Sequence, residues 1–332
     1  MIAQIDARYV KVRPAKAASR LVSYALFEGR PVTTKGRWIN PVIKFLFAME
    51  KRLPIRNRVK NPVFIVGTGR SGTTILGIVL SMHRDVGFLN EPKSLWNSIY
   101  PHEDIIGSYS LGDASYRLDA THVSADIKQA AQRLFSFYLL LTRSSRLVDK
   151  YPELIFRVPF VREIFPDAKF LFLVRNGWDT CHSIEHWSQR LGMCKDSEVH
   201  DWWGVNNRKW NLLVDQLVPE HPLLSAHCEK IRNLTRHVDM AAVEWILTMR
   251  EGLEMQKKYP ESIKTVYYEK LASNIDDVVP GLLDFCELEP DDKFLKYART
   301  TMKPAGLKPP FELDPVIRPA FDEQMRNLGY TT

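Results

Sequence analysis

A glycine-bracketed, hydroxyl-rich loop follows a short apolar run and is the segment of this chain best suited to chemistry. Run and loop read VFIVGTGRSGTT over residues 63–74, and a second apolar run follows over residues 75–80. A strand, a glycine loop and a helix in this order bring backbone N–H groups and a helix N-terminus together around an anion. The sequence therefore predicts a phosphate-binding loop.

This loop departs from the one found in nucleoside triphosphatases. The pattern G-x-x-x-x-G-K-[ST] requires a lysine at position 73, where this chain has Thr73. The cation stands inside the loop instead, at Arg70. A phosphate-binding loop without its lysine indicates a different donor chemistry.

Alternating strands and helices after Lys60 predict the scaffold that positions this loop. We expect an α/β fold of the P-loop type, with three layers, a central parallel sheet of about five strands and helices on both faces. Strands are expected over residues 62–66, 86–89, 147–149, 170–174 and 263–267. Helices are expected over residues 73–83, 122–143, 153–165, 177–191, 200–216, 240–258, 276–286 and 291–300. Residues 93–120 are expected to form an irregular loop on the substrate side.

Composition and cysteine usage fit an ordinary cytoplasmic globular protein. The chain has 332 residues, of which 45% are hydrophobic and 26% charged. Its four cysteines form no C-x-x-C pair, no metal-ligand spacing is visible, and we expect reduced thiols and no metal. We also expect neither a secretory signal nor a transmembrane helix.

The net charge of +7 is concentrated in residues 1–60, which hold 14 of the 46 basic residues and 3 of the 39 acidic ones. Apolar residues at helical spacing predict two amphipathic helices there, around residues 15–28 and 40–52. Such a basic amphipathic extension can lie on an anionic membrane surface, or it can pack on the main domain or on a second subunit. Nucleic acid is not expected, because no recognition motif is present.

Two further sequence segments form, together with the loop, a combination of motifs. LVDKYP at residues 147–152 leads to FPDAKF at residues 165–170, and LVRNGWDTCHS covers residues 173–183. With the loop, these segments resemble the sulfotransferases that use 3′-phosphoadenosine-5′-phosphosulfate (PAPS), closest to the bacterial and Golgi-type carbohydrate and protein-tyrosine branch. The resemblance covers roughly residues 60–330 and implies a sulfotransferase domain over residues 61–332.

The resemblance implies two anion sites for the donor. Arg175 ends a core strand, where ligands of open α/β sheets gather, and Ser183 lies two helical turns further on. Together they would bind the 3′-phosphate, because a guanidinium fork suits a phosphate. Tyr268, in the segment YEKL, is either a nucleotide contact or a buried core tyrosine. The 5′-phosphosulfate would be held by Gly69, Arg70, Ser71, Gly72, Thr73 and Thr74.

Sulfuryl transfer needs a group that stabilises charge and a group that deprotonates the acceptor hydroxyl. We expect Arg70 to be the stabiliser and Glu91, at the end of the second strand, to be the base if burial lifts its pKa. Glu91 can instead form a structural ion pair with Arg70 or Lys93. Lys150 either positions donor or acceptor, or forms an ion pair at the edge of the core. His182 and His186 are weaker candidates for the base.

The sequence indicates the acceptor substrate less specifically than the donor. A hydroxyl on a glycan, a glycolipid or a lipid-like natural product is expected, and four tryptophans in one region provide either an aromatic platform or the core of a helical cap. They are Trp187, Trp202, Trp203 and Trp210. The sequence leaves open a homodimer and a peripheral position on the inner face of a membrane.

Two other functions use the same loop. A nucleotide kinase or triphosphatase would need a carboxylate for Mg²⁺, which Asp149 offers, and a cation near the γ-phosphate, which Thr73 does not supply. A non-catalytic nucleotide-binding protein is the second alternative.

Overall fold

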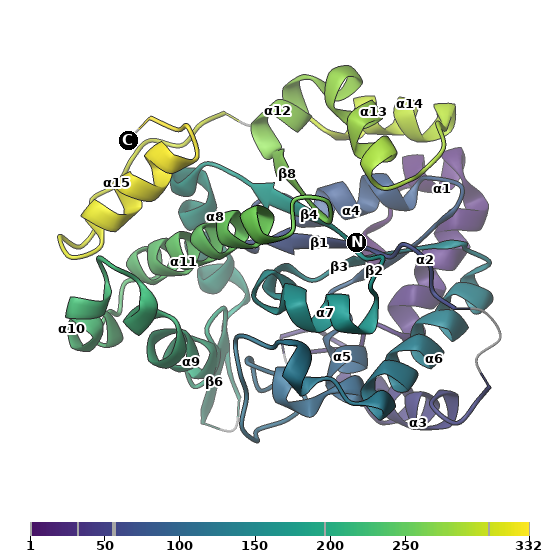
Figure 1. Cartoon of the computed structure of the whole chain (residues 1–332), viewed down its shortest axis with the longest axis horizontal. Coiled ribbons are helices and arrows are strands. Elements are labelled where there is room, and N and C mark those ends of the chain that lie inside the picture. The colour runs from purple at the N-terminus through teal and green to yellow at the C-terminus, as the bar shows by residue number, and fades with distance from the viewer. Residues whose placement is uncertain (1, 32, 55–57, 196, 305, 332) are drawn as a thin grey trace.

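Five parallel strands form the central sheet of the protein, in the order β2-β3-β1-β4-β8. The structure is a computed structural model that describes residues 2–31, 33–54, 58–195, 197–304 and 306–331. The strands are β1 (Val63–Gly67), β2 (Val86–Asn90), β3 (Arg146–Lys150), β4 (Lys169–Val174) and β8 (Ile263–Tyr267). All five expected strands are confirmed, and the α/β fold with them (Figure 1).

Helices cover both faces of this sheet. Alternate residues of β1 enter different cores: Phe64 and Val66 pack in one, and Val63 and Ile65 in the other. Because successive side chains of a strand point to opposite faces, this division shows that neither face is open to water. The α-helices before β3 are α1 (Ala7–Val12), α2 (Pro14–Leu26), α3 (Asn40–Glu50), α4 (Thr73–Ser81), α5 (Lys93–Ile99) and α6 (Ala125–Thr142). Those after β3 are α7 (Val158–Ile164), α8 (Gly177–Leu191), α9 (Arg208–Gln216), α10 (Cys228–Arg232), α11 (His237–Lys258), α12 (Tyr268–Ser273), α13 (Ile275–Phe285), α14 (Asp292–Thr301) and α15 (Arg318–Asn327).

Two expected elements differ in the structure. The irregular loop expected from residue 93 begins with helix α5, which buries Leu95 and Trp96. The helix expected over residues 200–216 is a helix only from Arg208 onward, because a small antiparallel sheet precedes it: β5 (Met193–Lys195), β6 (Glu198–Asp201) and β7 (Gly204–Val205). Gly204 has a φ of 86°, which a glycine adopts without strain. This backbone conformation is incompatible with a continuous helix through residue 204.

Residues 1–60 lie against the main domain at the edge of the sheet. Lys16 Nζ donates to the carbonyl of Val86 at 2.8 Å, and Arg20 donates to the carbonyl of Phe88 at 3.2 Å. The carboxylate of Glu28 accepts the N–H of Asn90 at 2.8 Å. The extension is therefore attached along strand β2, as far as the residue that precedes Glu91.

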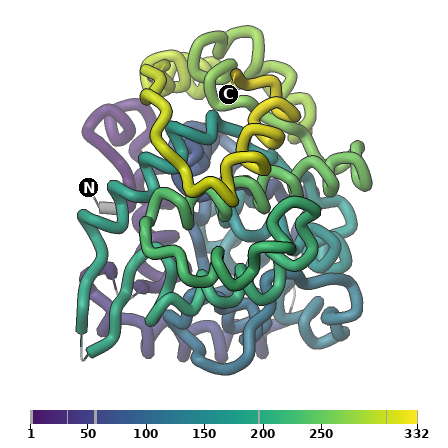
Figure 2. Tube along the Cα trace, turned by 90° about the vertical axis from the view of Figure 1, so that its left-hand side faces the viewer, coloured from purple at the N-terminus to yellow at the C-terminus, as the bar shows by residue number. Residues whose placement is uncertain are grey.

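The C-terminal segment returns over helix α8. Figure 2 shows this segment on the face that carries α15. The N–H of Lys308 donates to Asp179 at 2.7 Å, and Phe311 packs edge-on against Trp178 with ring centroids 4.9 Å apart. No described helix is both long and apolar enough to cross a bilayer.

Candidate active site

The loop between β1 and α4 is shaped by glycines that nothing larger could replace. Gly72 has a φ of 99° and begins α4, and Ser71 Oγ donates to the carbonyl of Thr68 at 2.6 Å. A Cβ on Gly69 would lie 2.5 Å from the ring of Trp202, and one on Gly72 would lie 2.4 Å from the ring of Tyr268. Both glycines therefore let an aromatic ring close over the loop.

Three predicted donor-binding groups meet at this loop. Arg70 Nε donates to Ser183 Oγ at 3.2 Å, and Arg175 donates to the carbonyl of Arg70 at 3.2 Å. Desolvation lowers the pKa of Arg70, and the like charges of Arg190 and Arg175 lower it further. The carboxylate of Glu91 raises this pKa but does not offset the other effects. Several guanidinium groups that face one another in this way favour an anion between them.

Arg175 has a buried donor group that the described part of the protein leaves without an acceptor. Its guanidinium lies 4.8 Å from the centre of the Tyr268 ring and 3.6 Å from Asp179, yet its Nε is buried without a hydrogen-bond partner among the described residues. The hydroxyl of Thr68, in the loop itself, is likewise buried without a hydrogen-bond partner in the described part of the chain. Buried donors without partners are unfavourable, so a phosphate group of a donor would satisfy a need already present.

The remaining predicted donor-binding residues also lie at or beside the loop. Thr73 is buried at the first turn of α4, and Thr74 lines the cavity described below. Tyr268, at the start of α12, lies with its ring against Gly72 and Arg175, so it flanks the loop.

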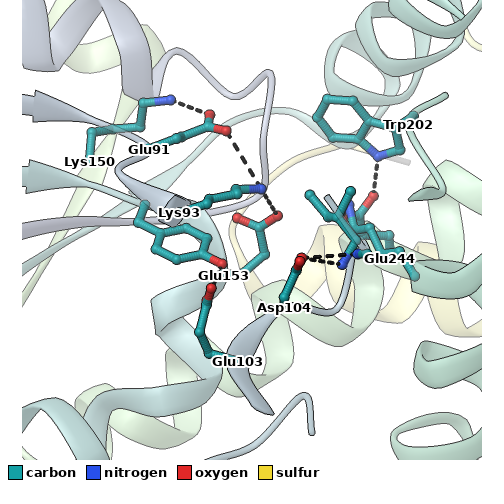
Figure 3. Close-up of polar contacts among 12 residues, drawn as sticks. Glu91, Lys93, Glu103, Asp104, Lys150, Glu153, Trp202 and Glu244 are labelled. Atoms are coloured by element: carbon teal, nitrogen blue, oxygen red, sulfur yellow. Dashed lines mark hydrogen bonds and ion pairs between the residues drawn. The ribbon is translucent and has the colours of Figure 1, made fainter. Parts of the chain in front are cut away.

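Glu91 lies in a chain of alternating charges across the ends of the strands (Figure 3). Lys150, at the end of β3, forms a hydrogen-bonded ion pair with Glu91. Glu91 is 3.6 Å from Lys93, and Lys93 is 3.0 Å from Glu153. The ion pair left open for Glu91 with Lys93 is thus present, whereas that with Arg70 is not among the described ion pairs.

The charges decide the protonation of Glu91. Desolvation by itself raises its pKa, but the ammonium groups of Lys150 and Lys93 outweigh this and hold the pKa well below its usual range. The expectation that burial lifts this pKa is therefore corrected by the structure. Glu91 is therefore ionised at neutral pH, the form that accepts a proton, although a carboxylate with so low a pKa is a weaker base than one that titrates near neutrality.

Both proposed catalytic side chains leave the backbone from strained positions. Arg70 has a φ of 69° and Glu91 a φ of 50°, in the left-handed region that residues other than glycine seldom occupy. Such conformations cost about 1–3 kcal/mol and cluster at functional sites. At Glu91 the turn is fixed by its N–H, which donates to the carbonyl of Lys150 at 2.7 Å.

We expect Lys150→Met to raise the pKa of Glu91, because the nearest positive charge is removed. The acid limb of the residual pH–rate profile should move to higher pH, since the carboxylate must be deprotonated to act as a base. Titration of the Glu91 carboxyl by carbon NMR gives the same quantity without turnover. Lys128→Met, which removes an exposed cation paired with Glu163, is the control, and an unchanged Glu91 pKa in Lys150→Met would contradict the charge assignment.

A cavity of about 730 Å³ opens above these groups. Arg70, Glu91 and Lys150 lie in its wall. Helix α8 adds Trp187 and Arg190, which follow Ser183 at i+4 and i+7 and therefore share its face. That spacing is the signal by which both could have been found in the sequence. The lining residues that sequence reasoning did not place there include Tyr24, Arg30, Tyr109, Glu153 and Lys209.

The four tryptophans divide between two roles. Trp203 and Trp210 are buried in the core under this region, with ring centroids 5.4 Å apart. Trp187 and Trp202 instead line the cavity and meet edge-on at 5.4 Å. Trp202 is held by a hydrogen bond of 2.6 Å to Glu244. Both alternatives left open for the cluster are thus realised, each by two of its members.

Asp149 and the weaker candidates lie elsewhere. Asp149 is fully buried and accepts the indole N–H of Trp96 at 2.8 Å, and burial raises its pKa to about 8. A neutral, core-facing carboxyl does not suit Mg²⁺, and the described residues contain no cluster of metal-ligating side chains. His182 lies 3.2 Å from the carbonyl of Pro309, under the C-terminal segment.

Comparison with known proteins agrees with this geometry. The model of the sulfotransferase family matches residues 62–222. A protein-tyrosine sulfotransferase of Drosophila melanogaster is 32% identical over 148 residues, which are 43% of this chain and 29% of that protein. Protein-tyrosine sulfotransferase A of Caenorhabditis elegans is 22% identical over 255 residues, which are 76% of this chain and 56% of that protein. The chain thus spans less than two thirds of either relative.

A solved structure shares the fold. The sulfotransferase domain of the Synechococcus PCC 7002 olefin synthase superposes with a TM-score of 0.50 at 16% identity. The superposition covers 83% of this chain and 98% of that domain. The expected three-layer architecture is therefore one that a sulfotransferase domain adopts.

Proposed function

We propose, on the premise that residues 62–222 match the model of the sulfotransferase family, that the protein transfers a sulfuryl group from PAPS to an acceptor hydroxyl. The convergence of Arg70, Arg175 and Ser183 on the glycine loop carries this proposal. PAPS has two anionic ends, and the chain offers donors for both.

The residues then have separate tasks in the transfer. When bound, PAPS supplies an activated sulfuryl group whose leaving group is a phosphate. Arg70 and the N–H groups of the loop stabilise the negative charge that develops on the transferred oxygens. Glu91, ionised and facing the cavity, accepts the proton of the acceptor hydroxyl as its oxygen attacks sulfur. Lys150 holds Glu91 in place until then.

The acceptor side supports an amphipathic molecule. Trp187 and Trp202 give the cavity an aromatic wall on which a sugar ring or an apolar chain can pack, and Arg190 and Lys209 add positive charge. We propose a hydroxyl of a glycan, a glycolipid or an amphipathic natural product. The names of two relatives add peptide tyrosine to the acceptors to be screened. A homodimer and a cytoplasmic location stay predictions.

The test is a thermal shift with 3′,5′-adenosine bisphosphate, 5′-AMP and ATP, each with and without Mg²⁺. A ligand that binds only the folded state raises the melting temperature. We expect a shift with the bisphosphate that is larger than with 5′-AMP and indifferent to Mg²⁺. A Mg²⁺-dependent shift with ATP, and none with the bisphosphate, would favour the kinase alternative and overturn the proposal.

Arg175→Met is expected to weaken binding of the bisphosphate by about 10–100-fold, since hydrogen bonds to charged groups contribute about 1.5–3 kcal/mol. Binding of 5′-AMP, which lacks the 3′-phosphate, should change much less. Isothermal titration with both ligands measures this difference. The control is Arg299→Met, which removes an exposed guanidinium paired with Asp276. Equal losses for the two ligands would show that Arg175 does not read the 3′-phosphate.

A further inference from the structure

The outer face of α3 and its flanks carries a continuous stripe of exposed apolar side chains. Its members are Trp38, Val42, Phe45, Met49 and Leu53. At about 100° per residue, Val42, Phe45 and Met49 fall within roughly a sixth of the circumference of α3. Trp38 stands in the 3-10 turn before the helix, and Leu53 stands just beyond its end. Trp38 is 80% exposed and Phe45 is 64% exposed, whereas Ile43 and Phe47, on the inner face, are fully buried. The helix therefore has one apolar face in the core and a second in water, which marks an interaction site.

Positive charge flanks this stripe. Arg37, Lys44 and Arg52 are exposed beside it. Between residues 33 and 54, the one carboxylate is that of Glu50, and it is buried on the inner face. The stripe and its flank thus combine a wide apolar face with basic residues, which is the pattern of a helix that lies in a membrane interface.

The same face leads to the mouth of the cavity. A groove of about 490 Å³ runs beside the stripe, and Arg37, Trp38, Lys44 and Lys195 line it. Tyr109 lines both this groove and the cavity that contains Glu91. A surface in contact with α3 would therefore lie next to the entrance for the acceptor. Figure 1 shows α3 at the lower margin of the fold, below α6.

We propose that α3 docks this protein on an anionic membrane surface. Trp38, Phe45 and Met49 enter the interface, and Arg37 and Lys44 contact the phosphates of the headgroups. A second copy of the chain is the less suitable occupant, because a two-fold contact through this face would bring its basic flanks together. Combined with the proposed sulfuryl transfer, on which this step rests, docking presents the cavity to hydroxyl groups of amphiphiles in the membrane.

The experiment is flotation of the full chain with vesicles of phosphatidylcholine alone or mixed with phosphatidylglycerol. We expect binding to the anionic vesicles that weakens as salt is raised. Trp38→Ser and Phe45→Ser should each weaken it about tenfold or more, because a buried aromatic side chain contributes that much. Arg37→Gln and Lys44→Gln should each weaken it about fivefold. Leu307→Ser, which changes a side chain that is 70% exposed on the C-terminal segment, is the matched control.

Three outcomes would overturn the docking proposal. Equal binding to both kinds of vesicle would show that the negative charge of the lipid is not required. Unchanged binding in the stripe variants would show that α3 is not the docking surface. A dimer in sedimentation that Phe45→Ser converts to monomer, without vesicle binding, assigns the stripe to a second copy. Melting temperature and bisphosphate binding are measured on the same samples. If the unsubstituted chain binds the bisphosphate but not the anionic vesicles, docking alone is overturned. If it binds the vesicles but not the bisphosphate, the transferase proposal alone is overturned.

Discussion

Glu91→Gln should lower kcat by about 10²–10⁴-fold, the range over which a general base contributes, while binding of 3′,5′-adenosine bisphosphate is kept. The substitution preserves the shape of the side chain and its place after β2, but an amide cannot accept the proton of the acceptor. Donor binding is expected to survive because the donor-binding groups come from the glycine loop, Arg175 and Ser183. Single-turnover assays with saturating donor, beside titration of the bisphosphate, separate the two effects.

A matched control exists for the backbone strain at Glu91. Glu287 also has a positive φ, 53°, but it is exposed and lies after α13, away from the cavity lining. Glu287→Gln should leave kcat unchanged. If Glu91→Gln kept most of the turnover, Glu91 would be a structural partner of Lys150 and not the base. If it abolished bisphosphate binding as well, the protein would fit a nucleotide binder whose carboxylate orders the site.

Arg20→Met should reduce the free energy of unfolding by about 3–5 kcal/mol, because it leaves a buried carboxylate without its partner. Arg20 and Glu28 are both buried, and their ion pair is formed at 2.5 and 3.0 Å. Glu28 also holds the N–H of Asn90, directly before Glu91. Denaturant unfolding measures the loss, and kcat of the remaining folded protein should fall as well, since the catalytic turn loses its support.

Two variants separate the buried pair from charge in general. Arg20→Met combined with Glu28→Leu removes both charges and should recover much of the stability. Arg232→Met breaks a surface pair with Asp215, at 37% and 52% exposure, and should cost less than about 1 kcal/mol. A loss in Arg20→Met no larger than in Arg232→Met would mean that the N-terminal extension is not anchored through this pair.

The contact between Glu91 and Lys150 could be predicted only in part from the sequence. That Glu91 follows β2 and Lys150 ends β3 can be read from the chain, since both strands are short apolar runs. The sequence does not show that β2 and β3 are neighbours in the sheet. This adjacency brings the lysine onto the carboxylate and lowers the pKa that burial alone would raise. The direction of a pKa shift therefore depended on a long-range contact.

The tryptophan region and the N-terminal extension show the same limit. Trp202 and Trp203 are adjacent in sequence, yet one lines the cavity and the other fills the core, because successive residues around a tight turn face different sides. Residues 15–28 and 40–52 read correctly as helices, but no local pattern indicates that Tyr24 and Arg30 would line the cavity that contains Glu91.

The sequence by itself determined the parts whose physics is local. Glycines at positions 69 and 72, hydroxyls between β1 and α4, and an arginine where β4 ends dictate an anion-binding loop at one edge of a parallel sheet. Tertiary structure alone decided which charges pair, which aromatic rings face the cavity, and that residues of the N-terminal extension line it. Those outcomes depend on contacts between residues far apart in the chain, and local propensity carries no information about them.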